Sequence, residues 1–553
     1  MKKPSLLALA LVLIFSLVFT SCESLNSETA SGSAVITESA SPVVDSSITA
    51  EEATGDFSIT TEDGAFSRSG SVYTLSAAGT YTLTGNLSGQ ILVAAGEDDE
   101  VEIDLSGVTI KYDKDSPIKI VSASKVEISA KSDTENIVTD NRSVKTADSE
   151  DQGEGAISAK ADLKLKGSGT LVVTGNYNNG VHTTKDLTIQ KLSLKATAVN
   201  NAIKGKDSIT IKSGAVVAIS TSGDGVQTDN TDLNKSGEVR GDIVISGGAV
   251  TVYAAGDGFQ AAHNFELTTG EEGVAPAVTI YTGSYSGYTS SSASTTSYKG
   301  VKVQNELLIS SGSIALNCYD DGLHADYGTA FTAGGTGAGA IRISGGTVTA
   351  AVYAPEGKTG GGRMGPRGGW GGQQSVSGAD AIHADSTLAI SGGTVLIDSS
   401  YEGLEANVIQ ITGGHTTVTA SDDGVNACSG TATPSVQVSG GYLDVTVSPN
   451  GDTDGIDSNG TYSQTGGVVI TRGPSSQMAA AIDADGSVTV SGGTLIVLGY
   501  GNVRTGGSVT STSSLSLHAS GSHTVTIDGS SYTFTNQNAY GRTTVYSDVS
   551  VSA

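Results

Sequence analysis

A seven-residue phrase that could hold a metal ion recurs along the chain. Its fullest copy, DDGLHAD at 320–326, places three carboxylates and a histidine around a glycine. Variants of it stand at 223–229, 256–262, 379–385, 401–407, 422–428, 453–459 and 479–485. One copy could be either a polar turn or a metal site. Regular copies predict the same position in every unit of a repetitive architecture.

The acids of this phrase are the candidate metal ligands. Carboxylates that stack in register repel one another unless a cation neutralises them. Several oxygen ligands that converge from neighbouring repeats are typical of a Ca²⁺ site. We therefore expect bound calcium rather than a bare, hydrated row of acids. The densest set of expected ligands is Glu402, Glu405, Asp422, Asp423, Asn426, Asp452, Asp454 and Asp457, and a second set is Asp320, Asp321 and Asp380.

Other residue types in the repeat and its insertions are candidates for ligand binding. His324 and His383 occupy the same position in two copies of the phrase. Such a pair could bind a transition metal, but we favour a polar edge that faces a sugar. Trp370, the single tryptophan, lies in the glycine-rich insertion 358–378. It could stack on a sugar ring, or it could be a loop aromatic without a function.

The spacing of the phrases indicates which elements position these residues. The central glycine or alanine recurs every 21 to 23 residues where no insertion intervenes. SGG or TGG turns lie between the phrases, flanked by alternating β-branched residues. This period-two alternation predicts short strands. A unit of this length cannot bury its own apolar face, so the units must stack.

Among stacked architectures, the sequence favours an all-β parallel β-helix. A βαβ sheet is excluded because no helical pattern separates the strands. A propeller blade needs about 40 residues, and the leucine-rich pattern is missing. We expect about twelve coils, roughly 55–60 Å long at ~4.8 Å per coil. The residue after the phrase's hydrophobic position should point outward, as should the turn acid, while the hydrophobic residue and the following alanine point inward.

The composition and the N-terminal sequence limit the possible partners and the cellular compartment of the protein. The 553 residues carry a formal net charge of −27, which argues against nucleic acid and permits divalent cations. Residues 1–21 are predicted to be a secretory signal peptide. The sequence FTSC resembles a lipobox, with Cys22 as the lipidated residue. We therefore expect an exported, membrane-anchored lipoprotein, at the cell surface or in the periplasm.

The same features divide the chain into regions. Residues 22–54 are expected to be a lipidated flexible tether, 55–500 the parallel β-helix, and 501–553 a C-terminal cap that blunts the last open edge. Cys318 and Cys428 lie about three repeats apart, beyond the reach of a disulfide. We expect both to be free thiols, and the protein to be a monomer.

Four phrases carry a resemblance to a known family. YTLSAAGTYTLTGNLSGQILV, DDGLHAD, YEGLEANVIQITGG and SDDGVNA resemble bacterial secreted carbohydrate-binding β-helix proteins, typified by cellulose- and polygalacturonate-binding members. The resemblance spans about residues 60–550. It implies a right-handed parallel β-helix with bound calcium, similar in shape to pectate lyases, and polysaccharide as the partner. Two copies, ADAIHAD and AAAIDAD, have alanine where an acid would stand, so these repeats are the weakest candidates for metal.

These features are compatible with two classes of function and with a third that shares most of the same features. The favoured one is a non-catalytic binding module in which calcium bridges the protein to acidic plant-cell-wall glycans such as polygalacturonate. The alternative is a calcium-dependent pectate lyase, which needs a base to remove the proton beside the uronate carboxylate. Lys302 is the best candidate for that base; otherwise it offsets the acidic row. The third is a structural or adhesive surface rod.

Overall fold

The computed structural model describes residues 56–147, 152–287, 297–353, 378–449, 451, 453–474 and 479–553. The described residues all belong to one compact unit. This part is all-β, apart from the short 3-10 helix η1 (Gly283–Ser286). It holds no helix with the length and apolar character needed to span a bilayer. The predicted site residues Cys22, Trp370 and Asp452 lie outside the described residues.

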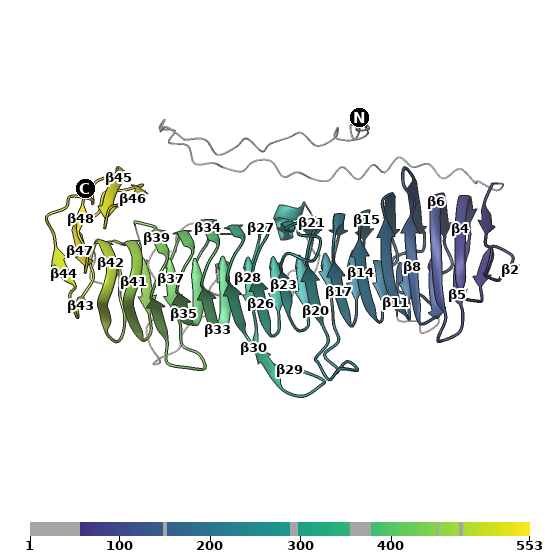
Figure 1. Ribbon diagram of the computed structural model, residues 1–553, viewed down its shortest axis with the longest axis horizontal. Coiled ribbons are helices and arrows are strands. Elements are labelled where there is room, and N and C mark those ends of the chain that lie inside the picture. The colour runs from purple at the N-terminus through teal and green to yellow at the C-terminus, as the bar shows by residue number, and fades with distance from the viewer. Residues whose placement is uncertain are drawn as a thin grey trace, which may run out of the picture. The chain divides into compact units, whose positions relative to one another are not determined.

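Most strands join one large sheet, and nearly all of its pairs are parallel and join equivalent strands of neighbouring repeats. The parallel pairs form three ladders, and Figure 1 shows their strands following one another side by side. The first ladder carries the recurring phrase. The all-β character and the parallel pairing that the sequence predicts are therefore confirmed.

The bounds of the strands follow the repeat. The first ladder comprises β3 (Val72–Leu75), β5 (Gln90–Ala94), β7 (Ile118–Ser122), β10 (Gly155–Ala159), β13 (Asn179–Thr183), β16 (Ile203–Gly205), β19 (Val226–Gln227), β22 (Phe259–Ala261), β25 (Val301–Val303), β28 (Leu323–Ala325), β33 (Ile382–Ile390), β35 (Leu404–Ile411), β37 (Val425–Ala427) and β40 (Ile456–Ser458). The second comprises β4 (Gly79–Ser88), β6 (Glu100–Tyr112), β8 (Lys125–Ala130), β11 (Asp162–Gly167), β14 (Asp186–Gln190), β17 (Ser208–Ile211), β20 (Asp242–Ile245), β23 (Phe265–Leu267), β26 (Glu306–Ile309), β31 (Ala340–Ile343), the ends of β33 and β35, β38 (Ser435–Val438), β41 (Thr461–Arg472), β42 (Val488–Leu498) and β43 (Val503–Thr505). The third comprises β9 (Glu135–Asp140), β12 (Thr170–Gly175), β15 (Leu192–Ala198), β18 (Gly214–Ser220), β21 (Ala249–Ala254), β24 (Ala277–Thr282), β27 (Ser313–Cys318), β32 (Thr347–Val352), β34 (Thr394–Ser399), β36 (His415–Ala420) and β39 (Tyr442–Val447), and it continues into β41 and β42.

The interior is built by the alternation of side chains along each strand. Leu323 and Ala325 of the phrase are fully buried, as are the equivalent residues Ile382 and Ala384. They belong to one continuous apolar cluster that extends through the three ladders. The predicted inward direction of these two positions is confirmed. Each buried Leu or Ile contributes about 1.5–3 kcal/mol relative to exposure, which explains why the units are stable only when stacked.

The two glycines of the SGG turns are required for different physical reasons. A Cβ on Gly392 would lie 2.4 Å from the carbonyl oxygen of Ser344 in the preceding repeat, so the first glycine allows adjacent turns to stack closely. Gly393 has φ of 77°, a left-handed conformation that strains other residues. The turn motif therefore sets the close approach between one repeat and the next.

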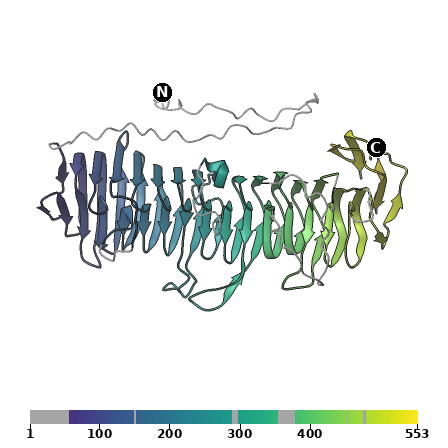
Figure 2. The same cartoon turned by 180° about the vertical axis from the view of Figure 1, so that it is seen from behind.

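Antiparallel strands flank the parallel ladders. At the N-terminal side, β1 (Ser58–Thr60) pairs with β4, and β2 (Phe66–Ser69) pairs with β3. At the C-terminal side, β47 (Thr543–Ser547) pairs with β42 and with β44 (Thr510–Thr512). The strands β45 (Gly521–Ile527), β46 (Ser530–Asn536) and β48 (Val551–Ser552) form a separate sheet, drawn in yellow in Figure 2. An insertion forms the hairpin of β29 (Tyr327–Ala330) and β30 (Thr336–Ala338).

Candidate functional site

One column of side chains follows the first ladder at the position after the buried hydrophobic residue. We call it the outward column. Each member pairs in register with the next one: His182, Lys204, Gln227, Gln260, Lys302, His324, His383, Glu405, Asn426 and Asp457. The register that the sequence predicts for this column is therefore confirmed at each of these nine steps. Basic and amide side chains occupy its first seven places, and two acids and an amide its last three.

The turn acids beside this column have a structural role that the sequence did not predict. Asp224 Oδ1 accepts a hydrogen bond from the backbone N–H of Asp257 at 2.9 Å, one repeat further on. Asp321 does the same for Asp380 at 2.8 Å, and Asp423 for Asp454 at 2.6 Å. Asn179 and Asn201 also accept from the next turn. An oxygen acceptor is therefore what the stacked turns require, and an amide can supply it.

The expectation that the turn side chains face outward is wrong for several of them. Asp257 is 3% exposed, Asp321 6% and Asp380 7%. Asp257 and Asp321 point along the stack, where each accepts a backbone N–H of the next turn, whereas Asp380 faces His383. One oxygen of each such carboxylate is thereby engaged, which leaves the other for a further partner.

The densest set of predicted calcium ligands is brought together in the structure, apart from Asp452. We call the described residues of this set the acidic cluster: Glu402, Glu405, Asp422, Asp423, Asn426, Asp454 and Asp457. Asn426 donates from Nδ2 to Glu402 at 2.8 Å. Its Oδ1 is buried and has no hydrogen-bond partner among the described residues. A carbonyl oxygen in that state is available to a cation.

The electrostatics of the acidic cluster are unfavourable without a counter-ion. Burial and the charge of Glu405 raise the pKa of Glu402 to about 8. Burial raises the pKa of Asp423 well above its usual range, with Glu402 and Asp454 adding to the shift. The chain has no lysine or arginine between Arg367 and Arg472, although that stretch holds eleven acids. Protons, histidines or bound cations must therefore neutralise these carboxylates.

The second predicted calcium set, Asp320, Asp321 and Asp380, is divided between two partners. The ammonium of Lys299 lies 3.2 Å from Asp320 and 2.5 Å from Asp321. Burial alone would lower the pKa of Lys299, but the charges of these two carboxylates outweigh it and raise it. Asp380 instead faces His383. Sequence reasoning missed the role of Lys299, because only the stacked repeats bring its ammonium to Asp320 and Asp321.

The two predicted histidines lie one above the other on β28 and β33. Their rings stack with centroids 4.6 Å apart and planes 14° apart. His324 Nδ1 is 2.8 Å from Asp321, and its Nε2 is 2.9 Å from Asp326. His383 Nδ1 is 3.0 Å from Asp380 and 3.2 Å from Glu405, and its Nε2 is 3.1 Å from Asp385.

The pKa of His383 reflects these contacts. Burial alone would lower the pKa, but the hydrogen bonds with Asp380, Asp385 and Glu405 raise it far above its usual range. Glu405 shows the reverse: burial would raise its pKa, but His383 lowers it to about 2. The three neighbouring carboxyl groups therefore favour the protonated imidazole of His383.

Lys302, the predicted lyase base, pairs with an acid of the neighbouring repeat. Its Nζ lies 3.5 Å from Asp326 Oδ2, with the lysine side chain 25% exposed. Its column neighbours are Gln260 and His324. A lysine in this setting balances the charge of the neighbouring carboxylate.

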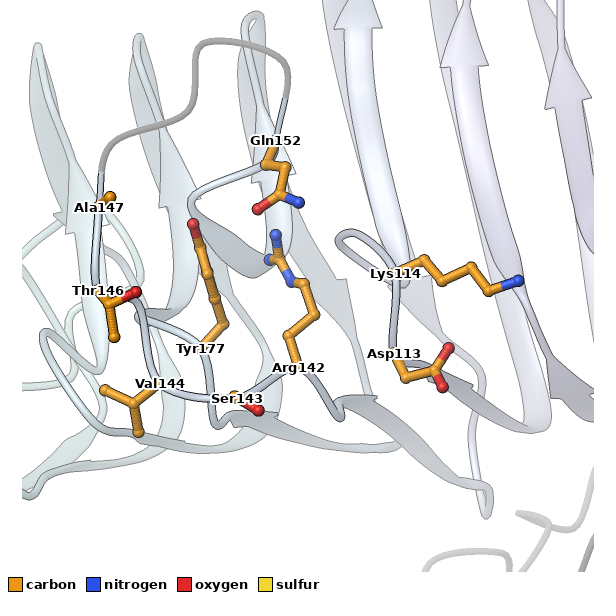
Figure 3. Close-up of a pocket in the computed structure, with 9 residues that line it drawn as sticks. All are labelled: Asp113, Lys114, Arg142, Ser143, Val144, Thr146, Ala147, Gln152 and Tyr177. Carbon is orange, nitrogen blue, oxygen red and sulfur yellow. The ribbon is translucent and has the colours of Figure 1, made fainter.

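A hollow of about 360 Å³ lies in the N-terminal part, outside the outward column. Figure 3 shows Arg142 beside Tyr177 within it, and Arg142 lies 3.8 Å from the ring centroid of Tyr177. Arg142 Nη2 is 2.6 Å from Asp140, while its buried Nη1 finds no hydrogen-bond acceptor in the described part of the chain. Sequence reasoning missed this hollow because turns outside the recurring phrase line it.

Both predicted free thiols are confirmed. Cys318 is buried and Cys428 is half-buried, and neither forms a disulfide. Burial raises the pKa of Cys428 to about 12, and the neighbouring Glu405 carboxylate adds to the shift. Cys428 therefore remains a neutral thiol beside Glu405.

Comparisons with known proteins indicate a carbohydrate-binding relationship. A relative from Acetivibrio thermocellus, described as a carbohydrate-binding domain-containing protein, is 40% identical over 113 residues, which are 20% of this chain. This chain covers 40% of that relative's length. A solved structure, the polysaccharide lyase-like protein from C. thermocellum as a gadolinium derivative, is 28% identical and covers 44% of this chain and 89% of that chain, with a TM-score of 0.37. That score is too low to support a structural argument.

The family match is broader. The family model described as carbohydrate-binding domain-containing protein matches residues 69–357 and 341–424, more than half of the chain. The matched residues include the phrases that carry the outward column from β13 to β35. The chain belongs to the family of carbohydrate-binding domain-containing proteins.

Proposed function

We propose that this protein is a non-catalytic, calcium-containing polysaccharide-binding protein for acidic glycans such as polygalacturonate. The observation that carries the proposal is the outward column in a member of a carbohydrate-binding family. Polar side chains stand one layer, about 4.8 Å, apart along it. An extended polysaccharide chain can make repeated hydrogen bonds along such a row.

Calcium in this proposal belongs to the acidic cluster. Glu402, Asp423 and Asn426 would supply oxygen ligands, with Asp454 and Asp457 of the next repeat. The fit is supported by the unpartnered Asn426 Oδ1 and by the raised pKa values of Glu402 and Asp423. Bound Ca²⁺ supplies a positive charge that a uronate carboxylate can share, where the bare cluster would repel it.

We propose further that the three ladders are the walls of one right-handed parallel β-helix of about twelve coils. The support is the parallel pairing of each strand with the strand one repeat away. Residues 1–21 are proposed as the export signal and Cys22 as a lipid anchor that places a monomer on the membrane, at the cell surface or in the periplasm. Release of a Cys22→Ser variant into the soluble fraction tests the anchor; unchanged fractionation contradicts it.

The alternative of a pectate lyase is less well supported by the site. A lyase base must stand beside the metal and lose its proton, whereas Lys302 is paired with Asp326. The ammonium of Lys299 is likewise held by two acids. A purely structural or adhesive rod shares the fold but needs no glycan selectivity.

One experiment separates the three functions. The purified protein is incubated with insoluble calcium polygalacturonate and, in parallel, with soluble polygalacturonate in calcium or chelator. We expect calcium-dependent co-sedimentation and no rise in the ultraviolet absorbance of unsaturated products. Product formation would establish the lyase, and absence of binding to both polygalacturonate and cellulose would leave the structural rod.

A further inference from the structure

Five residues from three consecutive repeats form a group that includes the two stacked imidazoles. We call it the histidine cluster: Asp321, His324, Asp380, His383 and Glu405. The strands β28, β33 and β35, which carry or follow these residues, lie side by side (Figure 1). Donor atoms of Asp321, His324 and His383 all lie within 4.8 Å of one another, and so do those of Asp380, His383 and Glu405. The two groups share His383.

The charges around this cluster do not balance. Asp321 is paired with Lys299 at 2.5 Å. Asp380, Asp385 and Glu405 all face the single imidazole of His383. Three carboxylates and one imidazolium leave two negative charges in a half-buried position. A divalent cation at this position would neutralise the surplus.

The donor types select the kind of cation. Ca²⁺ prefers oxygen ligands alone, whereas imidazole nitrogens favour Zn²⁺ and the related first-row ions. The stacked arrangement places two imidazoles on the same side of the sheet as the carboxylates. The thiol of Cys428 hydrogen-bonds Glu405, which adds a soft group beside the cluster. These features distinguish the histidine cluster from the neighbouring acidic cluster, whose remaining donors are oxygens.

We propose that the histidine cluster binds one divalent transition-metal ion, with zinc as the ion that fits it best. His324 and His383 supply nitrogen, and Asp321, Asp380 and Glu405 offer carboxylate oxygen. The imidazoles thereby serve as metal ligands and not as the polar, sugar-facing edge that the sequence favoured. Binding displaces the proton of His383, since a coordinating nitrogen must be unprotonated. The inference needs neither bound calcium nor polysaccharide, and the histidine cluster shares only Glu405 with the acidic cluster.

Cobalt titration of the chelator-treated full chain tests the inference, because Co²⁺ in a nitrogen-containing site gives visible absorption bands. We expect bands that saturate at one Co²⁺ per chain and disappear on addition of one equivalent of Zn²⁺. A tenfold excess of Ca²⁺ should leave them. No visible bands, or their removal by calcium, would overturn the inference.

Variants locate the ion. His324→Gln and His383→Gln should each weaken Co²⁺ binding by more than the roughly 10- to 100-fold that loss of an outer partner of a metal site costs. The matched control is His263→Gln, because His263 also faces a carboxylate, Asp242, at 2.8 Å, but lies outside the cluster. Equal affinity in parent and cluster variants places the ion elsewhere and overturns the inference.

A measurement on the parent protein covers the case in which the variants do not fold. X-ray absorption at the zinc edge of the singly loaded chain should show the scattering of coordinated imidazole rings. A spectrum with oxygen neighbours only contradicts the inference. Isothermal titration in buffers of different ionisation enthalpy should also report release of about one proton per Zn²⁺ near neutral pH.

Discussion

The N-terminal and C-terminal repeats of the first ladder share one backbone pattern but neutralise their acids differently. In the N-terminal repeats, Lys204 lies 2.7 Å from Asp229, and Lys145 lies 2.8 Å from Glu154. Between Arg367 and Arg472, eleven acids have no lysine or arginine in the intervening sequence. The same fold therefore carries one region whose lysines pair with its acids and one in which protons, histidines or bound cations must neutralise them.

This difference separates two roles of the recurring acids. Turn acids occur in both regions, and they accept a backbone N–H of the next turn in both. Asparagine does so equally well at positions 179 and 201. A turn acid is thus explained by stacking alone. What is particular to the C-terminal region is that acids also occupy the outward column, at Glu405 and Asp457, and concentrate charge there.

The largest expected effect lies at the boundary between the two regions. Lys299→Met removes the ammonium that balances Asp320 and Asp321, and removal of one partner from a buried ion pair costs about 3–5 kcal/mol. The free energy of unfolding, measured with denaturant, should fall by that amount. The matched control is Lys191→Met, whose side chain is 67% exposed and 3.7 Å from Glu272; it should change stability by about 1 kcal/mol at most. A similar loss in both variants would contradict the boundary role of Lys299.

Calcium should stabilise the C-terminal region selectively. Binding to the folded state alone contributes about 2.7 kcal/mol at a hundredfold excess of free ion over the Kd. The melting temperature should therefore rise between chelator and millimolar calcium. Hydrogen exchange should slow at β35, β37 and β40, with little change at β13 and β16. An unmoved melting curve, or protection spread evenly over the ladder, would remove the proposed calcium site.

The pH dependence of the metal-free protein follows from the same cluster. The pKa of Glu402 is raised to about 8 in the folded state. Its contribution to stability is complete below its unfolded pKa of about 4.3 and is lost as the pH rises through about 8. In chelator, the melting temperature should fall between pH 5 and pH 9. Saturating calcium should flatten this dependence because it favours the ionised carboxylates.

How much of this was predictable from sequence depends on the kind of feature. The register of the outward column followed from phrase spacing, since a fixed period places equivalent residues in neighbouring strands. The direction of the turn acids could not be predicted from the spacing, because their side chains accept hydrogen bonds from backbone N–H groups of the next repeat. The role of Lys299 could not be predicted either, because only the stacked structure brings it to Asp321. The hollow at Arg142 has no repeated signal at all.

Asp423 tests whether stacking and charge are separate functions of one residue. Asp423→Asn keeps an oxygen acceptor for the N–H of Asp454. It removes an ionisable carboxyl group whose pKa is raised by burial and by Glu402. In chelator at pH 8 it should be as stable as the parent or more stable by about 1 kcal/mol. Asp423→Ala leaves the N–H unpaired and should cost about 1–3 kcal/mol. In calcium, both variants should lose most of the stabilisation that the ion gives the parent. Equal melting of the two variants in chelator would show that the hydrogen bond is unimportant.

The smallest expected effect is that of Lys302→Ala. Lys302 lies in the outward column where the two regions meet. Lys302 is partly exposed and 3.5 Å from Asp326, and such pairs contribute about 0–1 kcal/mol. Under the binding proposal, stability and affinity for polygalacturonate should change little, and neither parent nor variant should form unsaturated products. The control is Lys204→Ala, which removes the equivalent column lysine beside Asp229 and should behave alike. Under the lyase alternative, the parent forms product and Lys302→Ala loses it while binding persists. Because the two outcomes differ in product and not in affinity, an absorbance assay run beside the sedimentation assay decides between them.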